Sequence, residues 1–195
     1  MKNYTITDEA NQLAKIINDV KANKVIILAH SIGGVYAMQM KDKVNNLKAF
    51  IGIEPTTREI ILNPPKEKNY IEKSKSIDKL EKQIKNDLAR ILTPEENEEF
   101  WNTTEQNAAK FDEKDNQNAQ SSLENDSYWK SDMRIDDDIP SIIITEEYRE
   151  EEYKRSEYHT SNPKSKIISL GDYHYIHFEY PEKITDIVGD IIEIV

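Results

Sequence analysis

The fold of this chain is decided by residues 24–40, which read KVIILAHSIGGVYAMQM. Residues 25–28 form a short apolar run rich in β-branched side chains, and such a run bounded by turn signals predicts a buried strand. A pair of glycines and a helix-like segment follow, so that Ser31 stands at the apex of a sharp turn between strand and helix. We expect the residues two before and two after Ser31 to be small, because this turn presses them together. Ala29 and Gly33 meet that demand.

The pattern over residues 29–33, AHSIG, resembles the nucleophile elbow G-x-S-x-G of the α/β-hydrolase fold. It departs from that motif at Ala29, where the first glycine usually stands. Alanine is still small, so the geometry of the turn is kept. Strand-glycine-glycine-helix turns also serve helix packing or phosphate binding, and the rest of the chain has to decide between these interpretations.

Length and composition limit the class of protein. With 195 residues the chain is long enough for one domain with a hydrophobic core. A net charge of -11 argues against nucleic acid and anionic membranes as partners, and the absence of cysteine excludes disulfides and thiolate metal sites. No apolar run reaches the roughly 18 residues of a membrane span, and residues 1–12 lack the apolar core of a secretory signal. We therefore expect a cytoplasmic protein without a metal or cofactor.

Hydrophobic periodicity predicts an alternation of helices and strands, which indicates a parallel sheet with right-handed crossovers. Thr5 or Thr7 can cap the first helix. The expected apolar face of that helix consists of Ala10, Leu13, Ile16, Ile17 and Val20. The predicted strands span 25–29, 47–53, 141–145 and 165–170, and the predicted helices include 8–21, 33–45, 77–92, a helix from 94, a segment within 146–158 and the C-terminal segment.

The middle of the chain, residues 64–135, differs in character from the flanking parts 1–63 and 136–195. It consists of charged segments with helical periodicity, including a capping box at 93–96 with proline at the first helical position. Residues 112–127 are polar and predict a loop or a poorly packed helix. The region is either a solvated helical insertion or a cap over a substrate pocket. In a cap, the aromatic residues that could face the substrate are Tyr70, Phe100, Trp101, Tyr128 and Trp129.

A serine nucleophile needs a base within hydrogen-bond reach. Of the four histidines, His174 and His177 alone follow a predicted strand end in a loop that begins with glycine. Residues 171–184, GDYHYIHFEYPEKI, resemble the C-terminal segment of α/β-hydrolases, in which the catalytic histidine follows the last strand. The resemblance implies that His174 is the base and His177 the second histidine often found three residues on, although both could simply be packing residues. His30 is interpreted as structural or as a substrate contact.

The two motifs occur in the order found in the family, with the serine early, the histidine last and two predicted strands between them. The resemblance covers residues 5–56 and 138–195. It implies an α/β fold, a partial α/β-hydrolase fold, with a mostly parallel sheet of about four strands flanked by helices and a helical cap. The backbone N–H of Ile32 would be one donor of the oxyanion hole.

The acid of the triad has several candidates. In most of the family it follows the strand before the histidine strand, where this chain has Glu146 and Glu147, with Arg149 near the expected carboxylate. Glu54 ends the strand after the elbow helix, where some members, haloalkane dehalogenases among them, carry the acid. Both places lie at the carboxyl edge of the sheet, where ligands bind in open α/β sheets. The alternative interpretation of the acidic run over 146–152 is a solvated helix face. A serine at position 31 argues against dehalogenase chemistry itself.

The family normally has several strands before the elbow, and here one predicted helix precedes it. The chain therefore resembles the C-terminal portion of a hydrolase, without the loop that supplies the second oxyanion donor. We expect the strand over 25–29 to be an unpaired apolar edge that pairs either in a homodimer or with a partner fragment.

Two functions follow from these expectations. The first is a serine hydrolase that acts on a small-molecule ester or related acyl substrate, with Ser31 as nucleophile, His174 as base and Glu54, Glu146 or Glu147 as acid. Substrate contacts would come from His30, Trp101 and Trp129. The alternative is a truncated, catalytically impaired remnant or a non-catalytic binding protein.

Overall fold

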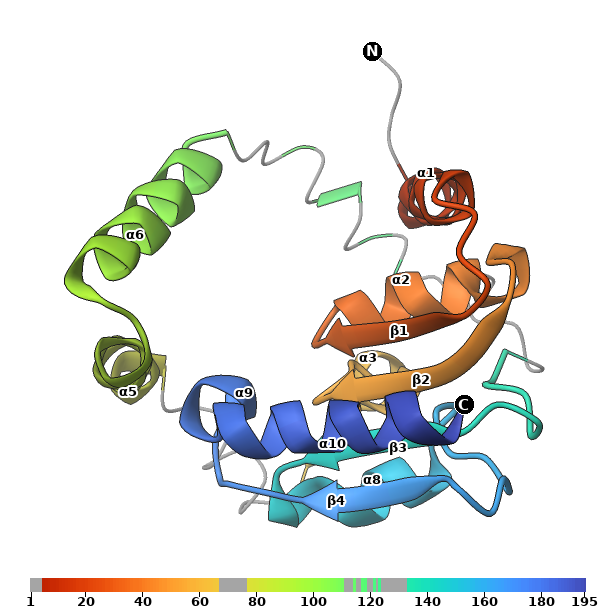
Figure 1. The fold of residues 1–195 in the computed structure, drawn as a ribbon. Coiled ribbons are helices and arrows are strands. Elements are labelled where there is room, and N and C mark those ends of the chain that lie inside the picture. The colour runs from red at the N-terminus through yellow and green to blue at the C-terminus, as the bar shows by residue number, and fades with distance from the viewer. Residues whose placement is uncertain are drawn as a thin grey trace.

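A sheet of four parallel strands forms the centre of the molecule (Figure 1). The computed structural model describes residues 5–66, 77–110, 114, 117, 118, 121, 123 and 133–195. The strands follow one another across the sheet in chain order, as expected when each pair is joined by a crossover connection. They are β1 (Val25–His30), β2 (Leu47–Ile53), β3 (Ser141–Thr145) and β4 (Lys166–Ser169).

Helices cover both faces of this sheet, which is the arrangement that an all-parallel sheet requires. On one face α1, α2 and α8 share a hydrophobic cluster with the strands, and on the other α9 and α10 do so. The described helices are α1 (Ile6–Asp19), α2 (Gly33–Met40), α3 (Arg58–Leu62), α5 (Ile77–Ile91), α6 (Pro94–Ala108), α8 (Glu150–Arg155), α9 (Ile176–Glu179) and α10 (Pro181–Ile194), with the short 3-10 helices η1 (Lys41–Lys43) and η3 (Glu147–Arg149).

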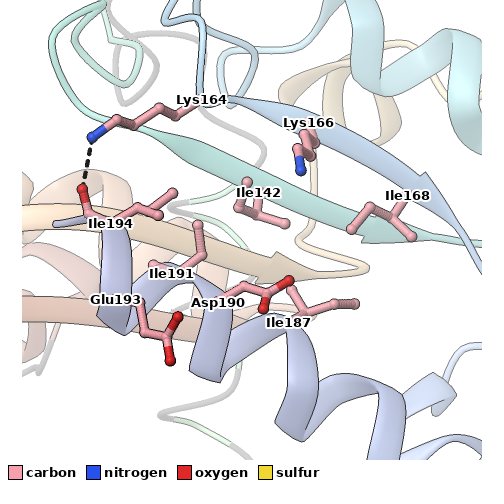
Figure 2. A pocket seen from close by; sticks show the side chains of 9 residues that line it. All are labelled: Ile142, Lys164, Lys166, Ile168, Ile187, Asp190, Ile191, Glu193 and Ile194. Atoms are coloured by element: carbon pink, nitrogen blue, oxygen red, sulfur yellow. Dashed lines mark hydrogen bonds between the residues drawn. The ribbon is translucent and has the colours of Figure 1, made fainter.

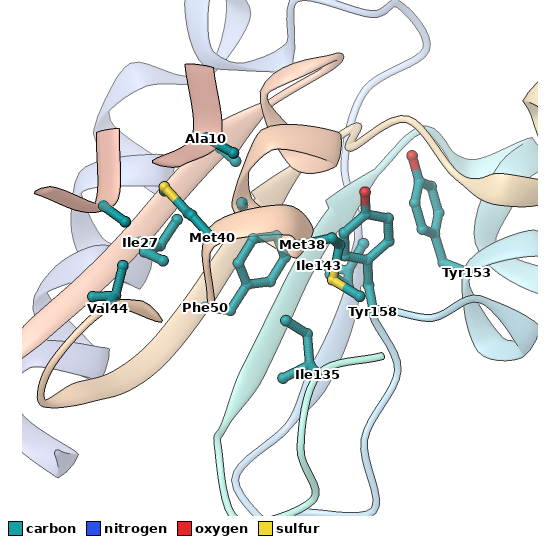
Figure 3. Packing of buried hydrophobic residues seen from close by; sticks show 13 residues of the cluster. Ala10, Ile27, Met38, Met40, Val44, Phe50, Ile135, Ile143, Tyr153 and Tyr158 are labelled. Atoms are coloured by element: carbon teal, nitrogen blue, oxygen red, sulfur yellow. The ribbon is translucent and has the colours of Figure 1, made fainter. Parts of the chain in front are cut away.

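The larger hydrophobic cluster lies under α2 (Figure 3). The ring of Phe50 on β2 stacks on that of Tyr158 with 5.4 Å between their centroids. Tyr158 and Tyr153 are fully buried, and their hydroxyl groups donate to the carbonyl oxygens of Thr56 and Pro55, respectively. These two tyrosines therefore fix the chain just beyond β2, where the candidate site begins.

The predicted α/β architecture is confirmed. β2 and β3 have the predicted bounds, because their continuous apolar sequences are buried on both faces of the sheet. The helix predicted over 33–45 is shorter, since α2 ends at Met40 and the single turn η1 follows.

The apolar face predicted for the first helix is confirmed at Ala10 and Ile17, which contact the core, and is wrong at its other three residues. Thr5 caps α1 in a capping box with Asp8, but α1 buries the small residues Ala10 and Ala14 and leaves larger ones outside. The small side chains let α1 approach α2 closely. Leu13, Ile16 and Val20 are 41%, 62% and 71% exposed.

The two outer strands of the described sheet differ in chemistry. β1 pairs with β2 along one side, and no described strand pairs with its other side, which we call the open edge of β1. The strand β1 contains no Lys, Arg, Asp or Glu, and its Leu28 side chain is 48% exposed. β4 is shorter and begins with the exposed Lys166, a charge that discourages strand pairing. The expectation that the elbow strand is an apolar edge is therefore met within the described part of the chain.

The described parts of the 64–135 region are largely helical. Figure 1 shows α5 next to α9, beyond the carboxyl ends of the strands, and α6 following α5 and extending away from the sheet. The predicted helix over 77–92 and the one from 94 correspond to α5 and α6. Tyr70, Tyr128 and Trp129 lie outside the described residues. Among the residues that are described, no helix combines the length and apolar character needed to cross a membrane.

Candidate active site

Ser31 occupies a strained turn at the end of β1. Its φ angle is +52°, a left-handed conformation that non-glycine residues rarely adopt. Its backbone N–H donates to the carbonyl oxygen of Ile53 at 3.1 Å, and its own carbonyl oxygen accepts from the N–H groups of Gly34 and Thr56, each at 2.9 Å. The chain leaving β2 thus holds the turn from both sides, and the conformation is that expected of a nucleophile elbow.

The position where the surrounding atoms leave no room for a side chain is Gly34, and not the predicted Gly33. A Cβ atom built on Gly33 would meet the Cβ of Ala29 at 3.8 Å, an ordinary contact. The same atom on Gly34 would lie 2.6 Å from Pro55 Cβ and 2.7 Å from the Tyr158 hydroxyl. The backbone of α2 approaches the end of β2 so closely that only glycine fits there.

Glu54 directly follows β2 and is completely buried, again with a positive φ of +46°. Its Oε1 atom accepts from the Thr145 hydroxyl and from the Glu146 N–H, each at 2.6 Å. Its Oε2 atom accepts from Arg149, and His174 Nδ1 lies 3.8 Å from the same oxygen. Of the three carboxylates considered from sequence, Glu54 is the one for which the described residues show a contact with His174.

These contacts give two neighbouring carboxyl groups, Glu54 and Glu146, different pKa values. Burial alone would raise the pKa of Glu54, but His174, Arg149 and the two hydrogen bonds to Oε1 lower that pKa below its ordinary value. Burial, and then the negative charge of Glu54, raise the pKa of Glu146 to about 7. Glu147 is exposed. Of the two buried carboxyl groups, Glu54 is therefore the one that is held in its ionised form at neutral pH.

His174 lies in the loop between β4 and α9, and His30 ties this loop to the elbow. The Nε2–H of His30 donates to the carbonyl oxygen of His174 at 3.1 Å. The ring of His30 lies with its centroid 4.6 Å from those of both His174 and His177. Burial lowers the pKa of His30, and the neighbouring His174 lowers it further. His30 thus has a structural contact, as one of the two sequence interpretations expected.

His177 is the third member of this histidine cluster. Its Nδ1 atom is buried and has no hydrogen-bond partner among the described residues. Burial, and then the proximity of His30 and His174, lower the pKa of His177 to about 4. At neutral pH this ring is uncharged, which allows three histidines to share one small volume.

The other predicted site residues lie in different settings. Ile32 is the residue that precedes α2, and its side chain is 40% exposed. Trp101 on α6 lies against its neighbour Phe100 and under the ammonium group of Lys85. Within the described residues, Ser31 Oγ makes no hydrogen bond to the His174 ring, so the triad contact at the serine remains a prediction.

Sequence reasoning did not assign a role to Thr145 or Arg149, the side chains that hold Glu54. The signal was present in Arg149, a basic residue that follows a strand end within an acidic run. Its partner could not be read from the sequence, because Glu54 and Arg149 lie 95 positions apart.

A cavity of about 220 Å³ lies elsewhere, between α10 and strands β3 and β4 (Figure 2). The isoleucine side chains of both layers face one another there, and Lys164 Nζ closes one end by donating to the Ile194 carbonyl oxygen at 2.6 Å. Lys166 is the first residue of β4, and Lys164 lies two residues before it. The cavity is therefore separate from the carboxyl edge that carries Ser31, Glu54 and His174. The described residues contain no group of three His, Asp or Glu side chains arranged to hold a metal ion.

No family model and no curated protein sequence matches this chain. Solved structures do resemble it. The protein Smu.1393c from Streptococcus mutans superposes with a TM-score of 0.75 at 22% identity, and the match covers 98% of this chain and 72% of that one. The N-acyl homoserine lactonase AidH superposes with a TM-score of 0.61 at 10% identity, covering 98% and 71% of the two chains.

A thermophilic esterase from Thermogutta terrifontis gives a TM-score of 0.51 at 16% identity, covering 97% and 72% of the two chains. Several of these neighbours are named as hydrolytic enzymes, esterases or lactonases. Their likeness extends over nearly the whole chain and agrees with the parallel sheet flanked by helices. This chain has the α/β-hydrolase fold.

Proposed function

We propose that this protein is a serine hydrolase that cleaves an ester or a related acyl bond in a small molecule. The observation that carries the proposal is the contact between His174 Nδ1 and the buried, ionised Glu54, placed beside the strained Ser31 turn. A carboxylate at Nδ1 keeps the proton of the imidazole on that nitrogen and leaves Nε2 free to act as a base. Structural neighbours named as esterases and lactonases support the same class of substrate.

In the proposed reaction Ser31 Oγ attacks the carbonyl carbon of the substrate, while its proton passes to His174 Nε2. The backbone N–H of Ile32 donates to the oxyanion that forms. His174 then gives its proton to the leaving alcohol, which departs and leaves an acyl group on Ser31. A water molecule, activated by His174, attacks the acyl group and releases the acid and free enzyme.

We also propose that α5 and α6 belong to a cap over this site. The hydroxyl of Tyr173 donates to Asp87 of α5 at 2.5 Å, and Arg90 of α5 donates to the carbonyl oxygen of Glu179 at 3.2 Å. Phe100 of α6 lies with its ring 6.2 Å from that of Phe178. These contacts attach the helices to both sides of His174 in the chain, where a cap would control substrate access.

The open edge of β1 is proposed to pair with a strand of a second polypeptide, either a second copy of this chain or a fragment that brings further strands. Unpaired backbone groups beside exposed apolar side chains are a template for such pairing.

The test of the proposed function is labelling of the purified chain with a fluorophosphonate, followed by peptide mapping. We expect a covalent adduct on Ser31 and hydrolysis of p-nitrophenyl acetate, both lost in Ser31→Ala. Ser161→Ala, a change at an exposed serine away from the elbow, is the matched control and should keep both signals. Absence of label in the wild-type protein, or label retained in Ser31→Ala, would reject the hydrolase and favour a non-catalytic binding protein.

A further inference from the structure

Arg149 stands behind Glu54 in a buried ionic cluster. Its guanidinium donates through one NH group to Glu54 and through Nε and the other NH group to Glu152, at 3.0 and 2.7 Å. Glu152 in turn accepts from the hydroxyl of Thr57. Arg149, Glu152 and Thr57 are 5%, 6% and 0% exposed. A planar guanidinium gripped in this two-pronged way has one fixed orientation.

This arrangement leaves Glu54 no freedom to turn away from His174. Oε1 of Glu54 is bound by Thr145 and by the Glu146 N–H, and Oε2 lies between Arg149 and His174. A fully buried carboxylate without a cation nearby would take up a proton. Arg149 is the permanent cation in contact with it, since arginine does not lose its proton in proteins.

A second carboxyl group competes for the same place. Glu146 follows β3 as Glu54 follows β2, it is 6% exposed, and its side chain interacts electrostatically with both Glu54 and His174. Two adjacent buried carboxyl groups do not both lose their protons readily, because their negative charges repel. The one that is paired with a cation is the one that stays ionised. Of these two carboxylates, Glu54 is the one with a described ion pair to Arg149.

We propose that Arg149 is a positioning residue: held by Glu152, it orients Glu54 and keeps it ionised, and so makes Glu54 and not Glu146 the partner of His174. This inference rests on the proposed function, because it assigns a role to Arg149 through the base of that reaction.

The effect should be visible in a pH profile. The charged and titratable groups that face Glu54 are Arg149 on η3, Glu152 and Tyr153 on α8, Glu146 after β3, His30 at the end of β1 and His174. Arg149 is one of the groups that lower the pKa of Glu54, so removing its cation raises that pKa. The acid limb of the reaction, below which Glu54 is protonated, must then move to higher pH.

The experiment measures the second-order rate of Ser31 labelling by a fluorophosphonate between pH 5 and 9, with circular dichroism on every sample. Three variants are compared. Arg149→Met removes the positive charge, and Arg149→Lys keeps the charge but cannot form the paired hydrogen bonds of a guanidinium. Glu152→Gln weakens the hydrogen bonds that hold Arg149 in place. Arg155→Met is the matched control, because Arg155 lies on α8 but is 60% exposed at its side chain and pairs with Glu59 at 3.4 Å.

Folded Arg149→Met is expected to be labelled about tenfold or more slowly at pH 7, with its acid limb about one pH unit higher. Arg149→Lys should keep the position of the limb while losing part of the rate, and Arg155→Met should match the wild type. If Arg149→Met does not fold, Arg149→Lys and Glu152→Gln decide the matter, and a wild-type rate in both overturns the inference.

A purely structural role of Arg149 would give a different result. The Arg149 variants would then have a lower melting temperature, but the labelling rate per folded molecule and its pH profile would be unchanged. That outcome would also overturn the inference. A wild-type protein that is not labelled at all refutes the proposed function. A labelled wild type with unaffected variants refutes the role of Arg149 alone.

Discussion

His174 Nδ1 lies 3.8 Å from Glu54 Oε2, at a point where the loop after β4 meets the end of β2. This pair links the last strand of the sheet with the strand next to the elbow, two positions away in the strand order. The distance suits an ion pair and is longer than a hydrogen bond, as is common for catalytic contacts before substrate binds.

The choice of acid can be tested by three matched substitutions. Glu54→Gln should slow acylation of Ser31 by about 10³- to 10⁴-fold, because an amide in place of the carboxylate no longer favours the productive tautomer of His174. Glu147→Gln, at an exposed position, should have no effect, and Glu146→Gln should change the rate less than tenfold. Stopped-flow kinetics with an activated ester measures all three, and a larger loss in Glu146→Gln than in Glu54→Gln would reverse the assignment.

The close approach at Gly34 predicts a contrast between adjacent glycines. Gly34→Ala should lower the free energy of unfolding by about 1–3 kcal/mol, because its Cβ would lie 2.6 Å from Pro55. Gly33→Ala, with a contact at 3.8 Å, should change it by less than about 1 kcal/mol. Urea denaturation of both variants gives the two values, and equal destabilisation would show that the elbow itself, and not the α2–Pro55 contact, demands glycine.

The uncharged state of His177 predicts a pH dependence of stability. The pKa of this histidine is about 4 in the folded protein and has its ordinary value of 6.5 when unfolded. Between these values the unfolded chain binds a proton at His177 that the folded chain does not, so the contribution of His177 to the free energy of unfolding falls as the pH drops from 6.5 towards 4. Glu146, whose pKa is raised to about 7, contributes in the opposite direction and is common to the wild type and the variants compared.

His177→Phe should reduce that slope without removing it, since His30 also has a lowered pKa. Replacement of the exposed His159 by Gln is the control and should keep the wild-type slope. Denaturation curves at several pH values measure the slopes, and an unchanged slope in His177→Phe would contradict the prediction.

Pairing along β1 predicts an effect of Leu28→Lys on association. We expect the wild-type chain to self-associate as concentration rises, and the lysine to weaken this association because charge on an edge strand opposes pairing. Ile27 is unsuitable for this purpose, since it is 5% exposed and a lysine there would enter the core. Ile192→Lys, the same kind of change at a 58% exposed position on α10, is the control and should leave the association unchanged.

Sedimentation velocity follows the association, and hydrogen exchange of the amides of residues 25–29 reports whether the open edge is covered. A chain that stays monomeric at every concentration, with those amides strongly protected, would rule out pairing through β1.

How far the sequence could predict this molecule depended on the kind of interaction involved. The strands over 47–53 and 141–145 were predictable, because a continuous apolar run that is buried on both faces leaves a clear signal. The exposed side of α1 was not, because Leu13 and Ala14 both count as apolar and only the space next to α2 decides which is buried.

The candidate site shows the same division. Ser31 and His174 could be chosen from local motifs, whereas Glu54 and Glu146 are both glutamates that follow a strand. What distinguishes them is the contact of Glu54 with Arg149, which depends on where the end of β2 lies relative to η3. Which of the two glutamates contacts Arg149 is determined by packing between segments that are distant in the sequence. Hydrophobic periodicity contains no information about such contacts.

The hydrogen bond between His30 and the His174 carbonyl joins residues 144 positions apart, and this separation has a consequence for synthesis. At about 5–20 residues per second, the ribosome makes His174 roughly 7 to 30 seconds after the elbow. From the synthesis of Glu54 onward the nascent chain carries Ser31 and Glu54 without the His174 loop that contacts His30 and Glu54. A ribosome that stalls between codons 54 and 174 therefore leaves a chain that contains the proposed nucleophile and acid but lacks the proposed base.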